Sequence, residues 1–167
     1  MAIGPHAESE AHVLDKHDLS APSSSQLSVA LVTPRGSLAS RGVDEIVAPG
    51  VQGEFGVLPG HVAFISALKP GVLVLRNGSK RDLFAVGPGY LQVSASGQTR
   101  ILVQDAAAGP EVDTEEARSD RAAAEEQLKQ LATTDAQPGD LTSAQNRLAW
   151  GQARLDAAAA SSRGTGG

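Results

Sequence analysis

Apolar residues recur at every second position through the middle of the chain, which is the pattern typical of β-strands. Leu27, Val29 and Leu31 begin this pattern, and Pro34 ends the first run. Further apolar runs follow, each bounded by turn residues. They are Glu45–Ala48, Glu54–Leu58, Val62–Leu68, Val72–Arg76, Asp82–Val86, Tyr90–Ser94 and Arg100–Gln104. Short runs at this close spacing predict a β-sandwich of about 8–10 strands or a flattened barrel.

Three turn motifs lie between these runs. Asn77-Gly78 predicts a tight hairpin in which both residues adopt positive φ. Gly87-Pro88-Gly89 and Ser96-Gly97 predict two further turns, the first interpreted as a hairpin turn because Pro88 removes a backbone donor that a phosphate loop would need.

After Gln104 the periodicity becomes helical. Gly109-Pro110 separates the two regions, and Asp113 followed by Glu116 predicts a helix start of the capping-box type. A loop over Thr133–Gly139 precedes a second helix, expected to begin near Thr142. The apolar seams step by four and three residues: Ala117, Arg121, Ala124, Leu128 and Leu131, then Ala144, Leu148, Gly151, Leu155 and Ala158. These seams predict an antiparallel helical hairpin that is weakly held, because alanine methyls bury little apolar surface.

The predicted fold is therefore mostly β plus α. It divides into a flexible extension (1–26), a β-sandwich (27–108), a helical hairpin (109–160) and a disordered tail (161–167). The extension has neither the basic and apolar regions of a secretory signal nor the arginines of a mitochondrial transit peptide.

Composition narrows the function classes. The 167 residues contain no cysteine, which excludes disulfides and thiolate chemistry, and no apolar run long enough to span a bilayer. The formal charge of −5 and the lack of a basic cluster argue against nucleic acid as a partner. No phosphate-loop or nucleophile-elbow motif is present, so the chain is expected to be non-catalytic and without a cofactor. The spacing of His6, His12 and His17 fits one helical face poorly, so no metal site is expected.

The segment GVQGEFGVLPGHVAFISALKPG, residues 50–71, is more informative. Its glycines and prolines indicate tight turns around short strands, and Glu54 and His61 are polar residues in an apolar context. The residues alone leave two interpretations open. Glu54 points to solvent from an edge while His61 caps a turn, or both contact a partner protein.

The stretches GEFGVLPGH and ALKPG resemble the signature of the ATP synthase epsilon subunit family, whose mitochondrial equivalent is called delta. The later stretches AVGPGYLQV, RILVQDAA and EEARSDRAAAEEQL, and ARL at Ala153–Leu155, also resemble that family in the same order. The resemblance covers about residues 27–160. It implies a central-stalk rotor subunit that binds the gamma subunit and the membrane-embedded ring of c subunits, and couples proton flow to ATP synthesis.

The resemblance also implies roles for particular residues. Glu54 corresponds to an acidic residue facing the c-ring, and His61 to a histidine on the gamma side. The hairpin would inhibit ATP hydrolysis when extended towards the catalytic alpha/beta head. Some family members bind ATP through an Asp-x-x-Arg-Ala motif and two arginines. Here Glu115, Arg118 and Arg154 match in part, while Ser119 and Trp150 depart from the pattern, which argues against regulatory ATP binding.

The sequence fits two other function classes less well. A stand-alone β-sandwich binding module is the alternative, but such modules usually present aromatic platforms, and aromatic residues make up only 3% of this chain. An enzyme is disfavoured by the missing motifs. The implied location is the cytoplasmic face of a bacterial inner membrane, as a peripheral protein, with the matrix side of the mitochondrial inner membrane as the alternative.

Overall fold

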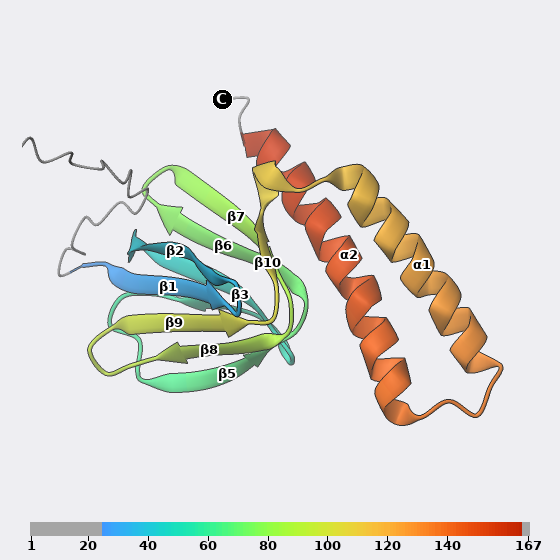
Figure 1. Ribbon diagram of the computed structural model, residues 1–167. Coiled ribbons are helices and arrows are strands. Elements are labelled where there is room, and N and C mark those ends of the chain that lie inside the picture. Colours follow the sequence, from blue (N-terminus) through green and yellow to red (C-terminus); the bar gives the residue numbers. More distant parts are fainter. Residues whose placement is uncertain (1–24, 165–167) are drawn as a thin grey trace, which may run out of the picture.

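The computed structural model describes residues 25–164, which form ten strands, one 3-10 turn and two helices (Figure 1). The elements are β1 (Leu27–Thr33), β2 (Gly36–Val43), β3 (Glu45–Gly50), β4 (Gly53–Val57), β5 (Phe64–Leu68), β6 (Gly71–Asn77), β7 (Lys80–Val86), β8 (Gly89–Val93), β9 (Gln98–Val103), β10 (Ala106–Ala108), η1 (Gly109–Glu111), α1 (Thr114–Ala132) and α2 (Pro138–Gly164). The predicted order of a β-sandwich followed by a helical hairpin is confirmed.

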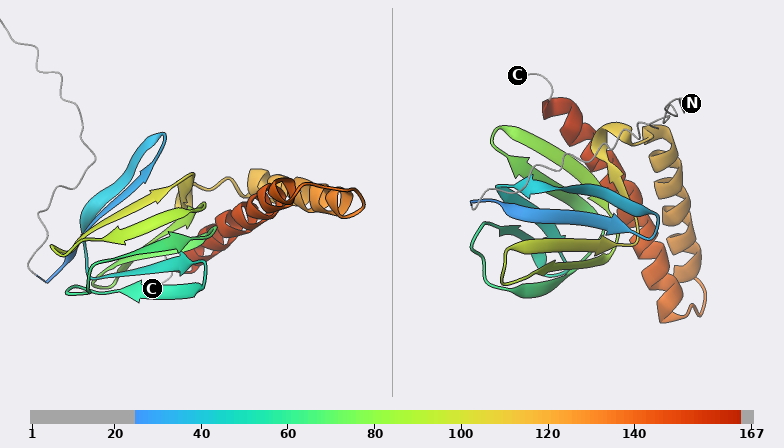
Figure 2. Two further views of the ribbon diagram at one scale, coloured as in Figure 1. Left: turned by 90° about the horizontal axis from the view of Figure 1, so that it is seen from below. Right: turned by 60° about the vertical axis from the view of Figure 1, so that its left-hand side comes forward.

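The strands follow one hydrogen-bonded path, β10-β7-β6-β3-β5-β8-β9-β1-β2, with β4 paired to β3. This path folds over into two layers (Figure 2). The path turns from one layer to the other at β3. Residues 45–47 of this strand pair with β6, whereas its last residue, Gly50, pairs with Leu68 of β5. One layer therefore contains β10, β7, β6, β3 and β4, and the other contains β5, β8, β9, β1 and β2.

Alternate residues of both layers fill the core. Leu27, Val29 and Leu31 of β1 are each at most 1% exposed, as the period-two pattern requires. They meet aliphatic side chains from the opposite layer, among them Ile46 and Leu73, in one continuous cluster. The core is made almost wholly of Val, Leu, Ile and Ala side chains, so the sandwich packs with few aromatic residues.

Two strands were missed by the sequence analysis. β2 (GSLASRGV) exposes most of its first half, so its polar residues hide the alternation that marks a strand. β10 is three alanines, a residue that favours helices over strands. Each forms because of its neighbour: β2 pairs along β1, and β10 pairs with the end of β7. Tertiary pairing therefore decides both elements.

The hairpin interpretation of Gly87-Pro88-Gly89 is wrong. β7 pairs with β6 and β10, whereas β8 pairs with β5 and β9, so this link carries the chain from one layer to the other. A layer crossing and a hairpin turn require similar turn residues, and only the pairing partners distinguish them. Ser96-Gly97, by contrast, joins β8 and β9, which are adjacent and antiparallel.

The turn between β6 and β7 is a hairpin, as predicted, but its register differs by one residue. Asn77 pairs with Lys80, so Gly78 and Ser79 are the two loop residues. Gly78 alone has positive φ, at 60°. Glycine at the first loop position is the arrangement of a type II′ turn, which needs one positive φ rather than two.

The hairpin helices begin and end for local reasons. Asp113 caps α1, since its Oδ1 accepts the backbone N–H groups of Glu115 and Glu116 at 3.0 Å each. The predicted start of the second helix is wrong: α2 begins at Pro138, a residue that suits a first helical turn, and Thr142 lies inside it with its hydroxyl donating to Pro138 O. It also continues to Gly164, past the expected end at Ala160.

The hairpin is folded against the sandwich. α2 lies on the outer face of β6 and β7, and α1 packs on α2 from the far side (Figure 1). Ala153 and Ala157 meet Ala85 and Val72 of the sheet, beside Trp150. Between the two helices, Gly151 of α2 allows a close approach to α1, because a methyl group there would lie 2.9 Å from Cβ of Arg121. The buried residues of the contact between α2 and the sheet are alanines, each of which buries little apolar area.

Asp44 connects the β6–β7 turn to Gln26 at one end of the sandwich through its carboxylate. The Gly78 N–H donates to its carboxylate at 2.6 Å and the Gln26 amide donates at 3.1 Å, which together lower the pKa of Asp44 below its ordinary value. The lowered pKa means that this connection is complete at pH values above the ordinary aspartate range and is lost as pH falls through the folded-state pKa. In an NMR titration the Gly78 amide should report a midpoint below the ordinary aspartate value in the wild-type chain, and no such step after Asp44→Asn. A midpoint at or above the ordinary value would contradict the assignment.

Candidate partner-binding surface

The β3–β4 hairpin places Glu54 at an exposed edge. Val51 and Gln52 form its two-residue loop. Gly53 has a φ of 132°, a backbone conformation that residues other than glycine rarely adopt. Glu54 then pairs in register with Pro49. Its side chain is exposed and forms no ion pair with any residue between 25 and 164. It borders a hollow of about 580 Å³ that also reaches Ile65 of β5.

His61 lies in the turn that follows β4. Its backbone N–H donates to Leu58 O at 3.1 Å, and Gly60 within the turn has a φ of 81°. The imidazole is exposed, with Nδ1 2.9 Å from Val62 O and its ring centroid 4.7 Å from that of Phe64. Phe64 in turn meets Phe55 edge-on at 5.9 Å. The two aromatic rings thus connect the His61 turn to the strand that carries Glu54.

An exposed row of apolar side chains crosses the outer face of the second layer. Register pairs place Ala67, Tyr90, Leu102 and Val32 side by side on β5, β8, β9 and β1. We call these four residues the apolar row. Tyr90 is 59% exposed and Leu102 48%, although both lie within strands. Neighbouring strand residues Leu91 and Ile101 point inward and are fully buried, so the row faces outward by strand alternation.

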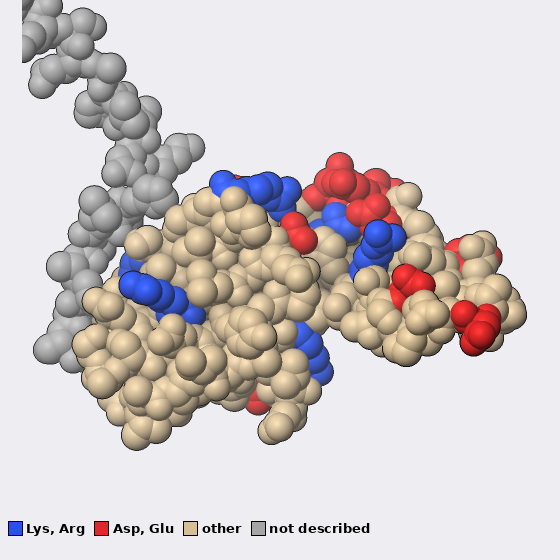
Figure 3. All heavy atoms as spheres, turned by 60° about the horizontal axis from the view of Figure 1, so that its bottom comes forward, with Lys and Arg blue, Asp and Glu red and all other residues tan. Residues whose placement is uncertain are grey.

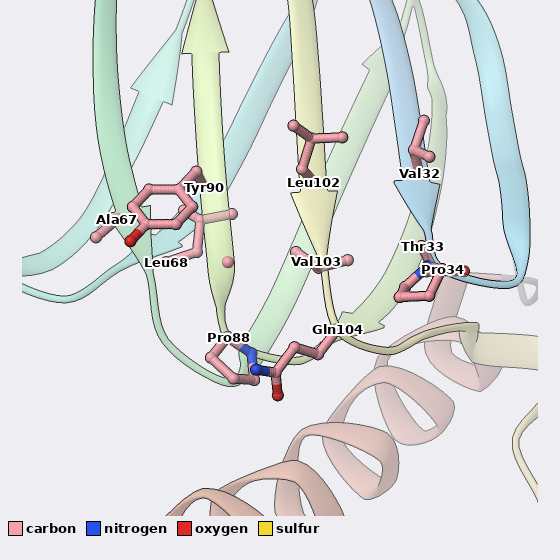
Figure 4. Close-up of a pocket in the computed structure, with 11 residues that line it drawn as sticks. Val32, Thr33, Pro34, Ala67, Leu68, Pro88, Tyr90, Leu102, Val103 and Gln104 are labelled. Carbon is pink, nitrogen blue, oxygen red and sulfur yellow. The ribbon is translucent and has the colours of Figure 1, made fainter.

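A hollow of about 580 Å³ lies along this row (Figure 4). Figure 4 shows the Tyr90 ring beside Ala67, with Leu102 and Val32 on the next strands. Gly89 allows the two central strands to approach here, because a methyl group at that position would lie 2.0 Å from Leu102 O. In Figure 3 most of the sandwich surface is uncharged, with a few separate patches of Lys and Arg, whereas Asp and Glu gather mainly on the hairpin. The outer face of the second layer is therefore an apolar surface suited to a protein partner.

The three residues suggested for nucleotide binding have different ion-pair partners. Glu115 and Arg118 form an ion pair with each other on the exposed side of α1. Arg154 is buried on α2, where its Nη2 lies 2.5 Å from Asp120 Oδ2 and its guanidinium covers the Trp150 ring at 5.4 Å. The arginine is therefore held within the hairpin by its own neighbours.

Sequence reasoning missed Tyr90, Leu102 and Asp120. The sequence does contain a sign of the first two, because Tyr90 and Leu102 occupy the positions of their strands that alternate with the buried residues. Their alignment into one row depends on the strand register, which the sequence does not show. Asp120 has no comparable signal, because its partner comes from the other helix.

Between residues 25 and 164, no group of three or more His, Asp or Glu side chains is placed to hold a metal ion. The helices in the same range are too short or too polar to cross a membrane.

Comparison with known proteins gives consistent relatives. A family model described as "ATP synthase, Delta/Epsilon chain, beta-sandwich domain" matches residues 26–109. The ATP synthase epsilon chain of Geotalea uraniireducens (strain Rf4) is 42% identical over 110 residues, covering 66% of this chain and 79% of that one. The ATP synthase epsilon chain of Myxococcus xanthus (strain DK1622) is 38% identical over 113 residues, covering 66% and 81%.

Solved structures share the fold. A chain of the Euglena gracilis mitochondrial ATP synthase, in its OSCP/F1/c-ring assembly, superposes with a TM-score of 0.65 at 22% identity, covering 80% of this chain and 81% of that chain. A chain of the Tetrahymena thermophila central stalk and c-ring gives a TM-score of 0.54 at 23% identity, covering 79% and 96%. The family model spans the whole sandwich and the relatives align over most of their own length, so the chain belongs to the ATP synthase delta/epsilon family as an epsilon-type chain.

Proposed function

We propose that this epsilon-type chain is a non-catalytic subunit of the central, rotating stalk of a proton-translocating ATP synthase. It links the gamma subunit to the c-ring and so couples proton flow to ATP synthesis. Family membership supports the assembly, and two fold neighbours come from complexes whose descriptions name the c-ring. A stand-alone binding module is not favoured, because the sandwich itself carries the family match.

The observation that carries the proposal is the exposed apolar row on a sandwich whose core is already complete. A strand face that exposes Tyr90 at 59% and Leu102 at 48% exposes apolar surface that water solvates poorly. Charged residues are depleted at the centre of protein interfaces, and none of the four residues of the apolar row is charged. We assign this row to the gamma subunit, together with the exposed His61 in the turn before β5, the strand that carries Ala67.

Glu54 is assigned to the c-ring. It extends from the tip region of the β3–β4 hairpin, which also carries the exposed Val51, and it forms no ion pair with any residue between 25 and 164. An exposed carboxylate without a partner suits the polar rim of an interface, where it adds orientation more than affinity.

The Glu54 assignment is tested by Glu54→Ala. An exposed rim contact contributes about 0.2–1 kcal/mol, so binding to the ring should weaken by up to about fivefold. The free energy of unfolding should remain within about 0.5 kcal/mol of wild type, since surface substitutions away from special features have small effects. The measurement compares ATP-driven proton pumping in vesicles with thermal melting of the isolated subunit.

Gln52→Ala, in the exposed loop of the same hairpin, is the matched control and should leave coupling unchanged. Loss of thermal stability in Glu54→Ala with normal proton pumping would show that the residue has a structural role instead.

The hairpin is assigned a regulatory role. Its buried contacts with the sandwich are made by Ala153 and Ala157, beside Trp150, so we expect it to leave the sheet at modest cost and extend towards the catalytic alpha/beta head, where it would inhibit ATP hydrolysis. Glu115, Arg118 and Arg154 are not assigned to tight ATP binding, because Asp120 and Trp150 already engage Arg154.

The proposed location follows from the assembly. A subunit that rests on the c-ring is a peripheral protein at the membrane surface, on the cytoplasmic face of a bacterial inner membrane. The alternative is the matrix side of the mitochondrial inner membrane. Both named relatives are bacterial, which favours the first.

A further inference from the structure

A basic hollow lies where the C-terminal end of α2 meets β7 and β10. Its volume is about 560 Å³, and Lys80, Arg81 and Arg163 line it together with Asp82. The hollow spans the boundary between sandwich and hairpin, since Lys80 and Arg81 begin β7 while Arg163 belongs to the last turn of α2. Whatever occupies it contacts both parts of the molecule.

The positive charge of this hollow is not balanced by its own lining. Asp82 is already shared, with Oδ2 2.8 Å from Arg41 Nη2 and Oδ1 3.9 Å from Lys80 Nζ. Within residues 25–164, neither Arg81 nor Arg163 forms an ion pair, and both side chains are exposed. The hollow therefore favours an occupant that carries carboxylates or another anionic group.

Gln26, near the start of the described part of the chain, lies beside this hollow. The Gln26 side-chain amide donates to Asp44 Oδ1 and to Asn77 Oδ1, each at 3.1 Å. Asn77 is the register partner of Lys80 across the β6–β7 turn. Residue 26 is thus held next to the turn from which the basic residues of the hollow begin.

The sequence before Gln26 has the complementary charge. Residues 1–24 contain four carboxylates, Glu8, Glu10, Asp15 and Asp18, with one lysine, Lys16, three histidines and no arginine. Asp18 is eight residues from Gln26, a separation that an extended chain covers over about 26 Å. Every carboxylate of this segment is therefore tethered within reach of the hollow, which raises its effective concentration there.

We propose that the acidic segment of residues 1–24 docks in the basic hollow and ties the C-terminal end of α2 to the sandwich. The segment acts as a brace on the folded hairpin, adding ionic contacts where the alanine contacts are weak. Because the contacts are exposed, they weaken with ionic strength, and the end of α2 is released first. This brace is a property of the isolated chain and does not depend on its assembly with gamma or the c-ring.

Carbodiimide cross-linking tests the contact, because this reagent joins carboxylates to lysine amines that touch them. Lys80 lines the hollow, whereas Lys69 and Lys129 are exposed at other places, Lys69 at the opposite end of β6. In the full-length chain, amide links from Glu8, Glu10, Asp15 or Asp18 should form with Lys80 in several-fold excess over both other lysines, as measured by mass spectrometry. Equal yields at the three lysines would overturn the proposal. So would links found solely between chains in a mixture of nitrogen-14 and nitrogen-15 protein, which would assign the hollow to a second copy.

Hydrogen exchange tests the effect on the hairpin. Deleting residues 1–24, or introducing Arg81→Gln with Arg163→Gln, should speed exchange at residues 157–164 by about three- to tenfold, the range for two or three exposed ion pairs. Combining both changes should add nothing further. Arg100→Gln, which removes an exposed arginine on β9 that also lacks an ion pair between residues 25 and 164, is the matched control and should leave exchange unchanged.

Unchanged exchange after the deletion would overturn the brace. Protection of the same amides by inorganic phosphate, with no effect of the deletion, would assign the hollow to a free anion and also overturn it.

Discussion

Gly89→Ala should destabilise the sandwich more than any other single methyl addition in its strands. A Cβ at this position would lie 2.0 Å from Leu102 O and 2.7 Å from Val103 Cα, which are backbone atoms that cannot rotate away. β8 must then separate from β9 at the start of their pairing, where Gly89 pairs with Val103. Overpacking against rigid atoms costs about 3 kcal/mol, so the melting temperature should fall by about 10 °C or more.

Gly56→Ala provides the matched control on β4. A Cβ there would make only ordinary contacts, the nearest at 3.7 Å to the Glu45 side chain, and Gly56 has no positive φ. Its melting temperature should match or slightly exceed that of wild type, because alanine restricts the unfolded chain. Equal melting temperatures for Gly89→Ala and Gly56→Ala in a calorimeter would refute the close approach of β8 and β9.

Tyr90→Asp should weaken binding to the gamma subunit by at least about 30-fold, or about 2 kcal/mol. The substitution removes the largest side chain of the apolar row and places an unpaired carboxylate in an interface that offers few polar partners. Stability of the isolated subunit should change little, since Tyr90 is 59% exposed in the free chain. Titration calorimetry of the isolated subunit with gamma measures the affinity, and circular dichroism checks the fold.

Tyr90→Phe separates apolar contact from hydrogen bonding. It keeps the ring against Ala67 and Leu102 and should bind gamma nearly as well as wild type. Wild-type affinity in Tyr90→Asp would show that gamma binds elsewhere on the sandwich. The brace proposed for residues 1–24 would be unaffected by that result, because it lies on the hairpin side of the molecule.

The site was partly predictable. The segment around Glu54 and His61 was recognised because its glycines and prolines mark local turns, and the turn geometry at Gly53 and Gly60 is confirmed by their positive φ values. The apolar row was not predicted, because Tyr90 and Leu102 lie 12 positions apart in the sequence and become neighbours only through the β8–β9 register.

Local patterns in the sequence determined most of the strands, the cap of α1 at Asp113 and the helical hairpin, since each depends on the spacing of residues within one element. The resemblance of several short segments to a known family indicated the family, and the comparisons then established it. Tertiary structure decided the rest: that β2 and β10 pair at all, that Gly87–Gly89 crosses between layers, and that Arg154 is held by Asp120. These features depend on which distant segment supplies the partner. A pairing between segments far apart in the chain produces no periodic pattern of residues in the sequence of either segment.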